Sequence, residues 1–132
     1  MTKQEALAKH LECSVKDVEL STYDDKTFIA EGEEYLVLLD NEADEIVKER
    51  IENEVCFFNA DFIAAHTHES ITEDVIKAVQ EKYEEGNEAL IHLITDFDRF
   101  VQDAVNSDGR GHFLNHYDGN EFEVGEYFIY QV

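Results

Sequence analysis

The first apolar positions of the chain recur with the spacing of a helix. Thr2 followed by Glu5 has the spacing of a capping box, and the apolar residues that come after them share one face. This pattern predicts a helix over about residues 3–11. Ser14 with Asp17 repeats the start signal and predicts a second helix, which carries the apolar residues Val15, Val18 and Leu20.

Residues 4–20 therefore have the pattern of a helix-turn-helix. A recognition helix in DNA presents basic or amide side chains to base edges and phosphates. The second predicted helix offers Lys16 beside Asp17 and Glu19, which would repel the duplex. We interpret the segment as a plain helical hairpin.

Two segments have the alternation and turn residues of β-hairpins. The first covers residues 27–39, with its turn around Gly32, and the second covers residues 121–130, with its turn at Gly125 and Glu126. The two hairpins resemble each other in their aromatic residues and turns. We expect them to meet in one small antiparallel sheet.

The chain between the hairpins predicts helices. An apolar stripe predicts a helix over residues 41–55, and an aromatic-rich segment continues into a short helix that ends near His66. A further helix is capped by Thr72 and interrupted by Gly86, and the longest helix covers about residues 88–106. Phe57, Phe58 and Phe62 are assigned to the core. The predicted fold class is α+β, with several helices packed on a small antiparallel sheet made from two β-hairpins.

Length and composition favour one soluble domain. The chain has 132 residues, 43% of them hydrophobic, and contains no proline. We predict a single acidic α+β domain over residues 1–132. No window is as apolar as a membrane span and the first residues lack a signal peptide, so we expect a cytoplasmic protein. Cys13 and Cys56 lie far apart and form no metal or redox motif, which predicts buried thiols.

The net charge of the chain indicates what kind of partner it binds. The 32 Asp and Glu residues against 10 Lys and Arg give a net charge of −22, well beyond what solubility needs. Such a surface repels nucleic acid and anionic membranes and attracts basic surfaces, including those that hold DNA or RNA. We therefore expect a basic protein partner, with no direct nucleic-acid or membrane binding.

Three segments resemble known proteins when they are read together. They are Glu33-Glu34-Tyr35-Leu36-Val37-Leu38, Asn59-Ala60-Asp61-Phe62-Ile63-Ala64-Ala65-His66, and the tail from Asp108-Gly109-Arg110-Gly111-His112-Phe113-Leu114 through Tyr117-Asp118-Gly119 to Tyr127-Phe128-Ile129-Tyr130. The chain resembles small acidic proteins of unassigned function encoded by bacteriophages and other mobile elements. The resemblance covers most of the chain and is most specific in the tail. It implies a phage context and the host cytoplasm, and it carries no catalytic residues.

Composition is also similar to that of DNA-mimic inhibitors among the antirestriction and anti-CRISPR proteins. Carboxylates at i, i+3 or i+4 on a helix, or at i, i+2 on a strand, reproduce the spacing of roughly 6–7 Å between phosphates. The candidate partner-binding residues are Asp24, Asp25, Glu31, Glu33, Glu34, Glu42, Asp44, Glu45, Glu81, Glu84, Glu85, Glu121 and Glu123. The leading hypothesis is an acidic phage-type inhibitor that occupies a basic, nucleic-acid-binding surface of a host defence protein.

Two alternatives remain open. The tail group Arg110, His112, His116 and Asp118 could handle a phosphate, and the pairs His112 with His116 and His66 with His68 could ligate a metal. The same residues also fit structural roles, and no motif of an enzyme is present, so we predict no catalytic residue and no cofactor. The other alternative is an interaction module with a basic partner that does not bind nucleic acid. An exposed sheet edge would permit a homodimer.

Overall fold

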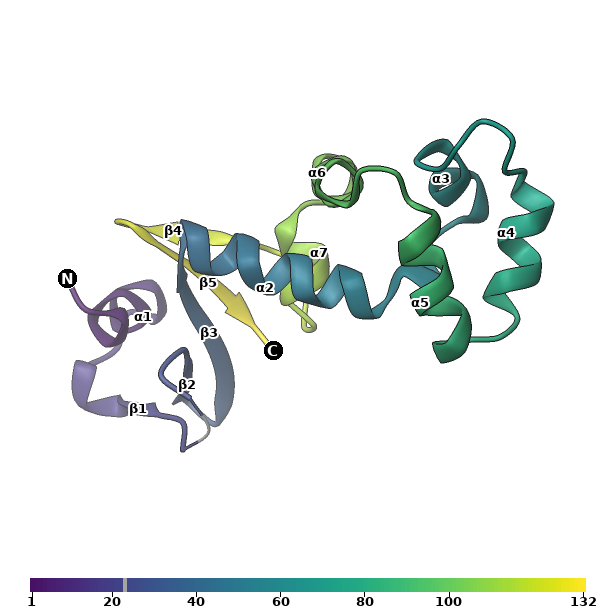
Figure 1. The fold of residues 1–132 in the computed structure, drawn as a ribbon. Coiled ribbons are helices and arrows are strands. Elements are labelled where there is room, and N and C mark those ends of the chain that lie inside the picture. The colour runs from purple at the N-terminus through teal and green to yellow at the C-terminus, as the bar shows by residue number, and fades with distance from the viewer. Residues whose placement is uncertain (23) are drawn as a thin grey trace. The chain divides into compact units, whose positions relative to one another are not determined.

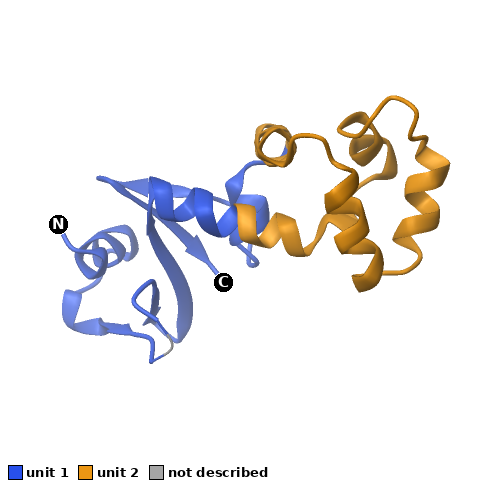
Figure 2. Ribbon diagram, viewed as in Figure 1, with its two compact units in different colours: residues 1–47, 108–132 blue, residues 48–107 orange. Residues whose placement is uncertain are grey.

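A computed structural model describes every residue of the chain except Tyr23. The chain forms two compact units, shown in different colours in Figure 2. Unit 1 contains residues 1–47 and 108–132, and unit 2 contains residues 48–107. Helix α2 (Asp40–Asn53) begins in unit 1 and ends in unit 2. The expectation of a single domain stays a prediction.

Unit 1 is built on a five-stranded antiparallel sheet (Figure 1). The strands lie in the order β1-β2-β3-β5-β4, with the bounds β1 (Val18–Leu20), β2 (Thr27–Ala30), β3 (Glu33–Leu39), β4 (Phe122–Val124) and β5 (Tyr127–Gln131). Both predicted hairpins are present, β2 with β3 and β4 with β5, and they meet through β3 and β5. The α+β fold class is confirmed.

The first hairpin turns through a two-residue loop, Glu31-Gly32. Both residues have positive φ, 54° at Glu31 and 80° at Gly32. A loop with φ above zero at both positions matches the twist of the two strands, and glycine meets that requirement without steric cost. Glu31 adopts the left-handed region as a non-glycine residue, which costs conformational energy.

Helix α1 (Lys3–Leu11) covers one face of this sheet. The predicted capping box is present, because the Thr2 hydroxyl accepts from the Glu5 N–H and the Glu5 carboxylate accepts from the Thr2 N–H. Buried side chains of α1 and alternate side chains of the strands form one core. The helix contributes Ala6, Leu7 and Ala8, and the strands contribute Val18, Phe28, Ala30, Tyr35, Val37, Tyr127 and Ile129. Leu36, Leu38 and Tyr130 point to the opposite face and are buried too. The apolar pattern thus places one core on each side of the central strands.

The predicted second helix over residues 15–20 is wrong. Ser14 does accept from the Lys16 N–H, but only a 3₁₀ turn over Val15–Asp17 follows. Val18 is extended and begins β1, which pairs with β2. A start signal supplies only the first turn of a helix, whereas pairing with β2 supplies ladder hydrogen bonds for this short segment.

Unit 2 is helical. Besides the end of α2 it contains a 3₁₀ turn (Val55–Phe57), α3 (Ala60–Ala65), α4 (Glu73–Gln80), α5 (Glu84–Leu93) and α6 (Phe97–Asp108), whose last residue falls in unit 1. The predicted cap at Thr72 and the helix end at His66 are confirmed. Phe57, assigned to the core, is wrong: its side chain is 72% exposed.

The predicted helix over residues 88–106 is two helices. Ile94 is extended and pairs with Thr67 in a single β-bridge, and the Thr95 N–H donates to the His66 carbonyl. The Asp96 carboxylate then accepts from the Arg99 N–H and caps α6. Apolar spacing continues through the break because Ile94 is buried as well. The sequence signal for the break is the capping residue Asp96, which lies on no helix.

Gly86 does not interrupt a helix as predicted. It lies within α5, and the break before that helix is at Tyr83, with φ 50° and ψ −119°. A Cβ at position 86 would stand 2.1 Å from the Val79 carbonyl oxygen on α4. The glycine therefore allows α4 and α5 to pack backbone against backbone.

Candidate acidic interaction surface

The 32 acidic and 10 basic residues divide 18 and 5 in unit 1 and 14 and 5 in unit 2. Each unit is therefore strongly acidic by itself. Ten of the candidate partner-binding residues lie in unit 1, and Glu81, Glu84 and Glu85 lie in unit 2. The contacts of these carboxylates separate those that stabilise the fold from those that face solvent.

Asp24 and Glu42 hold the fold of unit 1. The Asp24 carboxylate accepts from the N–H groups of Lys26 and Thr27 at 2.8 and 2.7 Å, which shapes the start of β2. The Glu42 side chain, 19% exposed, accepts from the Lys3 ammonium at 2.7 Å and from the Leu39 N–H at 2.9 Å. Glu42 thus closes the first turn of α2 and links it to α1.

Asp44 and Glu121 bind Arg110, which lies on α7 (Arg110–Leu114) in unit 1. The Arg110 side chain is 10% exposed, and its donors reach Glu121 at 2.7 Å, Asp40 at 2.8 Å and Asp44 at 3.0 Å. The guanidinium also stacks 4.6 Å from the ring centroid of Phe128. These contacts make Arg110 a tether between α7, α2 and the sheet.

Electrostatics of this tether act on its titratable groups. Burial opposes the charge of Arg110, but the bonds to Glu121 and Asp40 outweigh it and raise the pKa of the guanidinium. Burial, together with the hydrogen bond that the Tyr130 hydroxyl donates to Glu121, raises the pKa of Tyr130 well above its usual range. Arg110 is therefore committed to three carboxylates of its own unit, which leaves it unsuited to an incoming phosphate.

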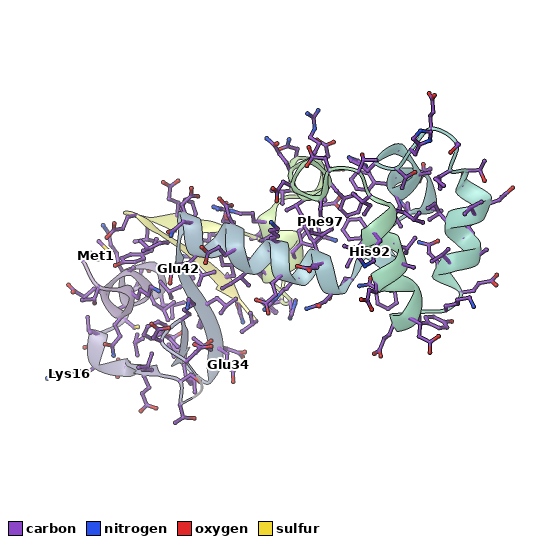
Figure 3. All side chains as sticks on the ribbon, viewed as in Figure 1. Met1, Lys16, Glu34, Glu42, His92 and Phe97 are labelled. Carbon is purple, nitrogen blue, oxygen red and sulfur yellow. The ribbon has the colours of Figure 1, made fainter. Side chains whose placement is uncertain are left out.

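Four other carboxylates of unit 1 lie on the first hairpin or on the strand paired with it. We define the hairpin patch as Glu19, Glu31, Glu33 and Glu34, all exposed, together with the exposed Ile29. Glu34 stands on β3 as labelled in Figure 3. The ion pairs of Lys3, Lys26 and Arg110 go to other carboxylates.

The register of the strands places three side chains of this patch in one row. Glu19 pairs with Ile29, and Ile29 pairs with Glu34, so the three side chains lie in one row across β1, β2 and β3. Neighbouring strands are about 4.8 Å apart, which places the two carboxylates of the row on the order of 10 Å from each other. Ile29, 37% exposed, forms an apolar centre between two negative charges.

The field of the patch extends to the Tyr35 hydroxyl. Burial raises the pKa of Tyr35, and the carboxylates of Glu31 and Glu33 raise it further. Burial likewise raises the pKa of the Cys13 thiol, with Glu31 as the next cause. Both groups resist ionisation because burial, and after it the negative charges nearby, disfavour the charged form.

The other exposed candidates stand apart from this row. Asp25 precedes β2, Glu45 is on α2 and Glu123 is on β4. In unit 2, Glu81 follows α4, and Glu84 and Glu85 lie in the first turn of α5. Lys82 lies in the chain between Glu81 and Glu84. Carboxylates at the N-terminus of a helix are favourably placed for its dipole, so Glu84 and Glu85 also stabilise α5.

The structure does not assemble the histidines into a metal site. His112 is on α7, but that helix ends at Leu114, so His116 does not share its face. Both ring nitrogens of His66 contact protein oxygens, and His68 contacts Ser70. Among the residues that the structure describes, no group of three or more His, Cys, Asp and Glu side chains is placed to hold a metal ion.

Three positions that the fold brings to these sites are absent from the candidate residues of the sequence. Ile29 and Glu19 enter the patch through strand register, and Asp103 contacts His66 across 37 positions of the chain. The alternation around Ile29 was a usable signal for an exposed apolar residue on a strand. No local signal links His66 with Asp103.

Comparison with known proteins finds no matching family, no significantly similar curated protein and no significantly similar solved structure. In the described part of the chain, no helix has the length and apolar character to cross a membrane.

Proposed function

We propose that this chain is a phage-type inhibitor that binds a basic, nucleic-acid-binding surface of a host defence protein and blocks it as a DNA mimic. The hairpin patch carries the proposal. Its carboxylates are exposed and lie outside the ion pairs of Lys3, Lys26 and Arg110. Glu19, Glu33 and Glu34 stand on paired strands, and Glu31 lies in the two-residue turn between β2 and β3.

Fixed strands matter because binding would then cost little conformational entropy. A carboxylate on a paired strand is already positioned, so ordering it against a lysine or arginine loses less freedom than ordering a loop. The net charge of −22 would steer association with a basic surface, and salt would slow that association by screening.

Ile29 offers an apolar contact that can slow dissociation of the complex. Exposed ion pairs contribute roughly 0–1 kcal/mol each, so a surface of carboxylates gives fast binding with little residence time. An apolar side chain in the middle of the row can be buried on contact and slow dissociation. The expected partner surface has basic side chains around an apolar or aliphatic centre.

The test is capture from host lysate on the immobilised chain at about 0.1 M salt, where the screening length is roughly 10 Å. The captured protein should be released by competing duplex DNA or RNA. A protein that stays bound in excess duplex but leaves in high salt would instead indicate a basic partner that does not use its nucleic-acid site.

A matched pair of variants separates the patch from total charge. The triple variant Glu31→Lys, Glu33→Lys and Glu34→Lys reverses three charges in unit 1, and Glu81→Lys, Glu84→Lys and Glu85→Lys reverses three in unit 2. We expect the first to weaken binding about 10–100-fold, from three lost contacts of up to roughly 1 kcal/mol each. Equal weakening by both variants would contradict the assignment to this patch.

A further inference from the structure

The imidazole of His66 lies between α3 and α6 in unit 2, and both of its ring nitrogens face oxygen atoms. Nδ1 is 2.9 Å from the Phe62 carbonyl oxygen, and Nε2 is 2.8 Å from Oδ2 of Asp103. The side chain is 12% exposed. Its ring packs on Phe62 and Phe100, with centroids 4.8 and 5.2 Å away.

These two contacts cannot both be hydrogen bonds of a neutral histidine. A carbonyl oxygen and an ionised carboxylate only accept, and neutral imidazole has a single N–H to donate. Neutral His66 would keep one bond and turn the lone pair of its other nitrogen toward an oxygen less than 3 Å away. The imidazolium has two N–H groups and satisfies both acceptors.

The charged groups around the ring agree with this requirement. On α6, Asp103 faces Nε2, and Arg99 of the same helix donates from Nε to both oxygens of Asp103, at 3.1 and 3.3 Å. The hydrogen bond from His66 is the largest cause that lowers the pKa of Asp103, followed by that from Arg99. The carboxylate is therefore ionised at neutral pH and acts as an acceptor.

Neighbouring elements hold the His66 backbone from the other side. Thr95, in the connection before α6, donates to the His66 carbonyl oxygen from its N–H at 3.0 Å and from its hydroxyl at 3.1 Å. On the α3 side the ring meets the uncharged Phe62. These two bonds join the end of α3 to the connection before α6, and the contact of the ring with Asp103 adds a second link that depends on the proton.

We propose that His66 and Asp103 form a proton-dependent strap between α3 and α6, closed when the imidazole carries two protons and open when it loses one. The closed form holds a proton that the open form releases. Linkage then requires that rising pH favours opening and that falling pH favours closure, until Asp103 itself takes up a proton in acid. The strap would set how firmly the end of α3 is held in unit 2.

Hydrogen exchange of the full chain between about pH 5.5 and 8.5 tests the strap. The amides to follow are those of His66 and Thr67, which donate to the carbonyls of Ile63 and Ala64 at the end of α3. After correction for intrinsic exchange, we expect local opening to increase at least about ten-fold over this range, equivalent to roughly 1.4 kcal/mol. His68→Gln, which changes a nearby exposed histidine, should keep this response.

Asp103→Asn is the decisive variant. The side-chain amide that it introduces can donate to the lone pair of Nε2 while Nδ1–H still donates to Phe62, so neutral histidine satisfies both contacts. The variant should keep α3 protected at high pH and lose the pH response. A pH response in Asp103→Asn equal to that of the wild type would overturn the strap.

Nitrogen NMR of the wild-type ring gives a second readout that needs no variant. We expect both nitrogens of His66 to carry protons at pH 5.5, and the loss of one proton to share its midpoint with the loss of α3 protection. A neutral ring at pH 5.5 with both contacts intact, or unchanged protection across the titration of the ring, would refute the proposal.

Discussion

Replacing Gly86 with alanine tests the close approach of α4 and α5, because two effects of opposite sign compete there. On helix propensity alone, Gly→Ala in a helix stabilises by about 1 kcal/mol. At position 86, however, the new Cβ would lie 2.1 Å from the Val79 carbonyl oxygen and 3.1 Å from its carbonyl carbon. The neighbouring atoms belong to the backbone, so no rotamer change relieves the clash.

The size of the clash decides the sign. Cβ atoms essentially never approach another heavy atom within 3.0 Å, so the α4 and α5 backbones must separate by about 0.9 Å or more. Overpacking of this kind costs roughly 1–3 kcal/mol, and rigid backbone places it at the upper end. After the gain in propensity is subtracted, we expect Gly86→Ala to lower the free energy of unfolding of unit 2 by about 2 kcal/mol.

Urea unfolding followed by circular dichroism, with hydrogen exchange of α5 amides as the local probe, measures this loss. Ala89→Gly is the matched control, since Ala89 is an exposed residue of the same helix and its replacement changes propensity alone. The control should cost about 1 kcal/mol. A Gly86→Ala protein as stable as the wild type would refute the backbone-to-backbone packing of α4 and α5.

Three further substitutions follow from the contacts in unit 1. Glu31→Asn should stabilise the chain by about 0.5–1 kcal/mol in thermal unfolding, because asparagine tolerates positive φ, and Glu31→Gln should not. Arg110→Met should lower the free energy of unfolding, measured in urea, by about 2–3 kcal/mol, because three carboxylates lose their cation while the packing on Phe128 is kept. The stability of Arg110→Lys should lie between those of the wild type and Arg110→Met. The hydrogen bond from the Thr2 backbone, with that from the Thr2 side chain, lowers the pKa of Glu5. The Glu5 carboxylate therefore stabilises the fold above its ordinary pKa, and this stabilisation is lost as pH falls through the lowered pKa. The difference in stability between the wild type and Glu5→Gln, measured at pH 7 and pH 3, should be smaller at pH 3.

Local signals determined much of unit 1. The capping box before α1 and the turns of the two hairpins involve residues a few positions apart, whose geometry depends on backbone dihedrals and short hydrogen bonds. The density of negative charge was equally available from the sequence, because charge does not depend on the fold.

Tertiary structure decided where local signals were ambiguous. Residues 18–20 join the sheet because β2 offers hydrogen-bond partners, and the apolar run through Ile94 breaks because Ile94 pairs with Thr67. The periodicity of side chains could not show either event, since a buried residue fits the pattern of a helix and of a strand alike.

The same division holds for the candidate sites. The sequence by itself determined that this protein is acidic and where its carboxylates lie along the chain. Only the fold separated Glu42 and Glu121, which are held by Lys3 and Arg110, from Glu31, Glu33 and Glu34, which face solvent. It also brought Asp103 to His66 from 37 positions away. Such contacts depend on the packing of distant segments, and no local pattern records them.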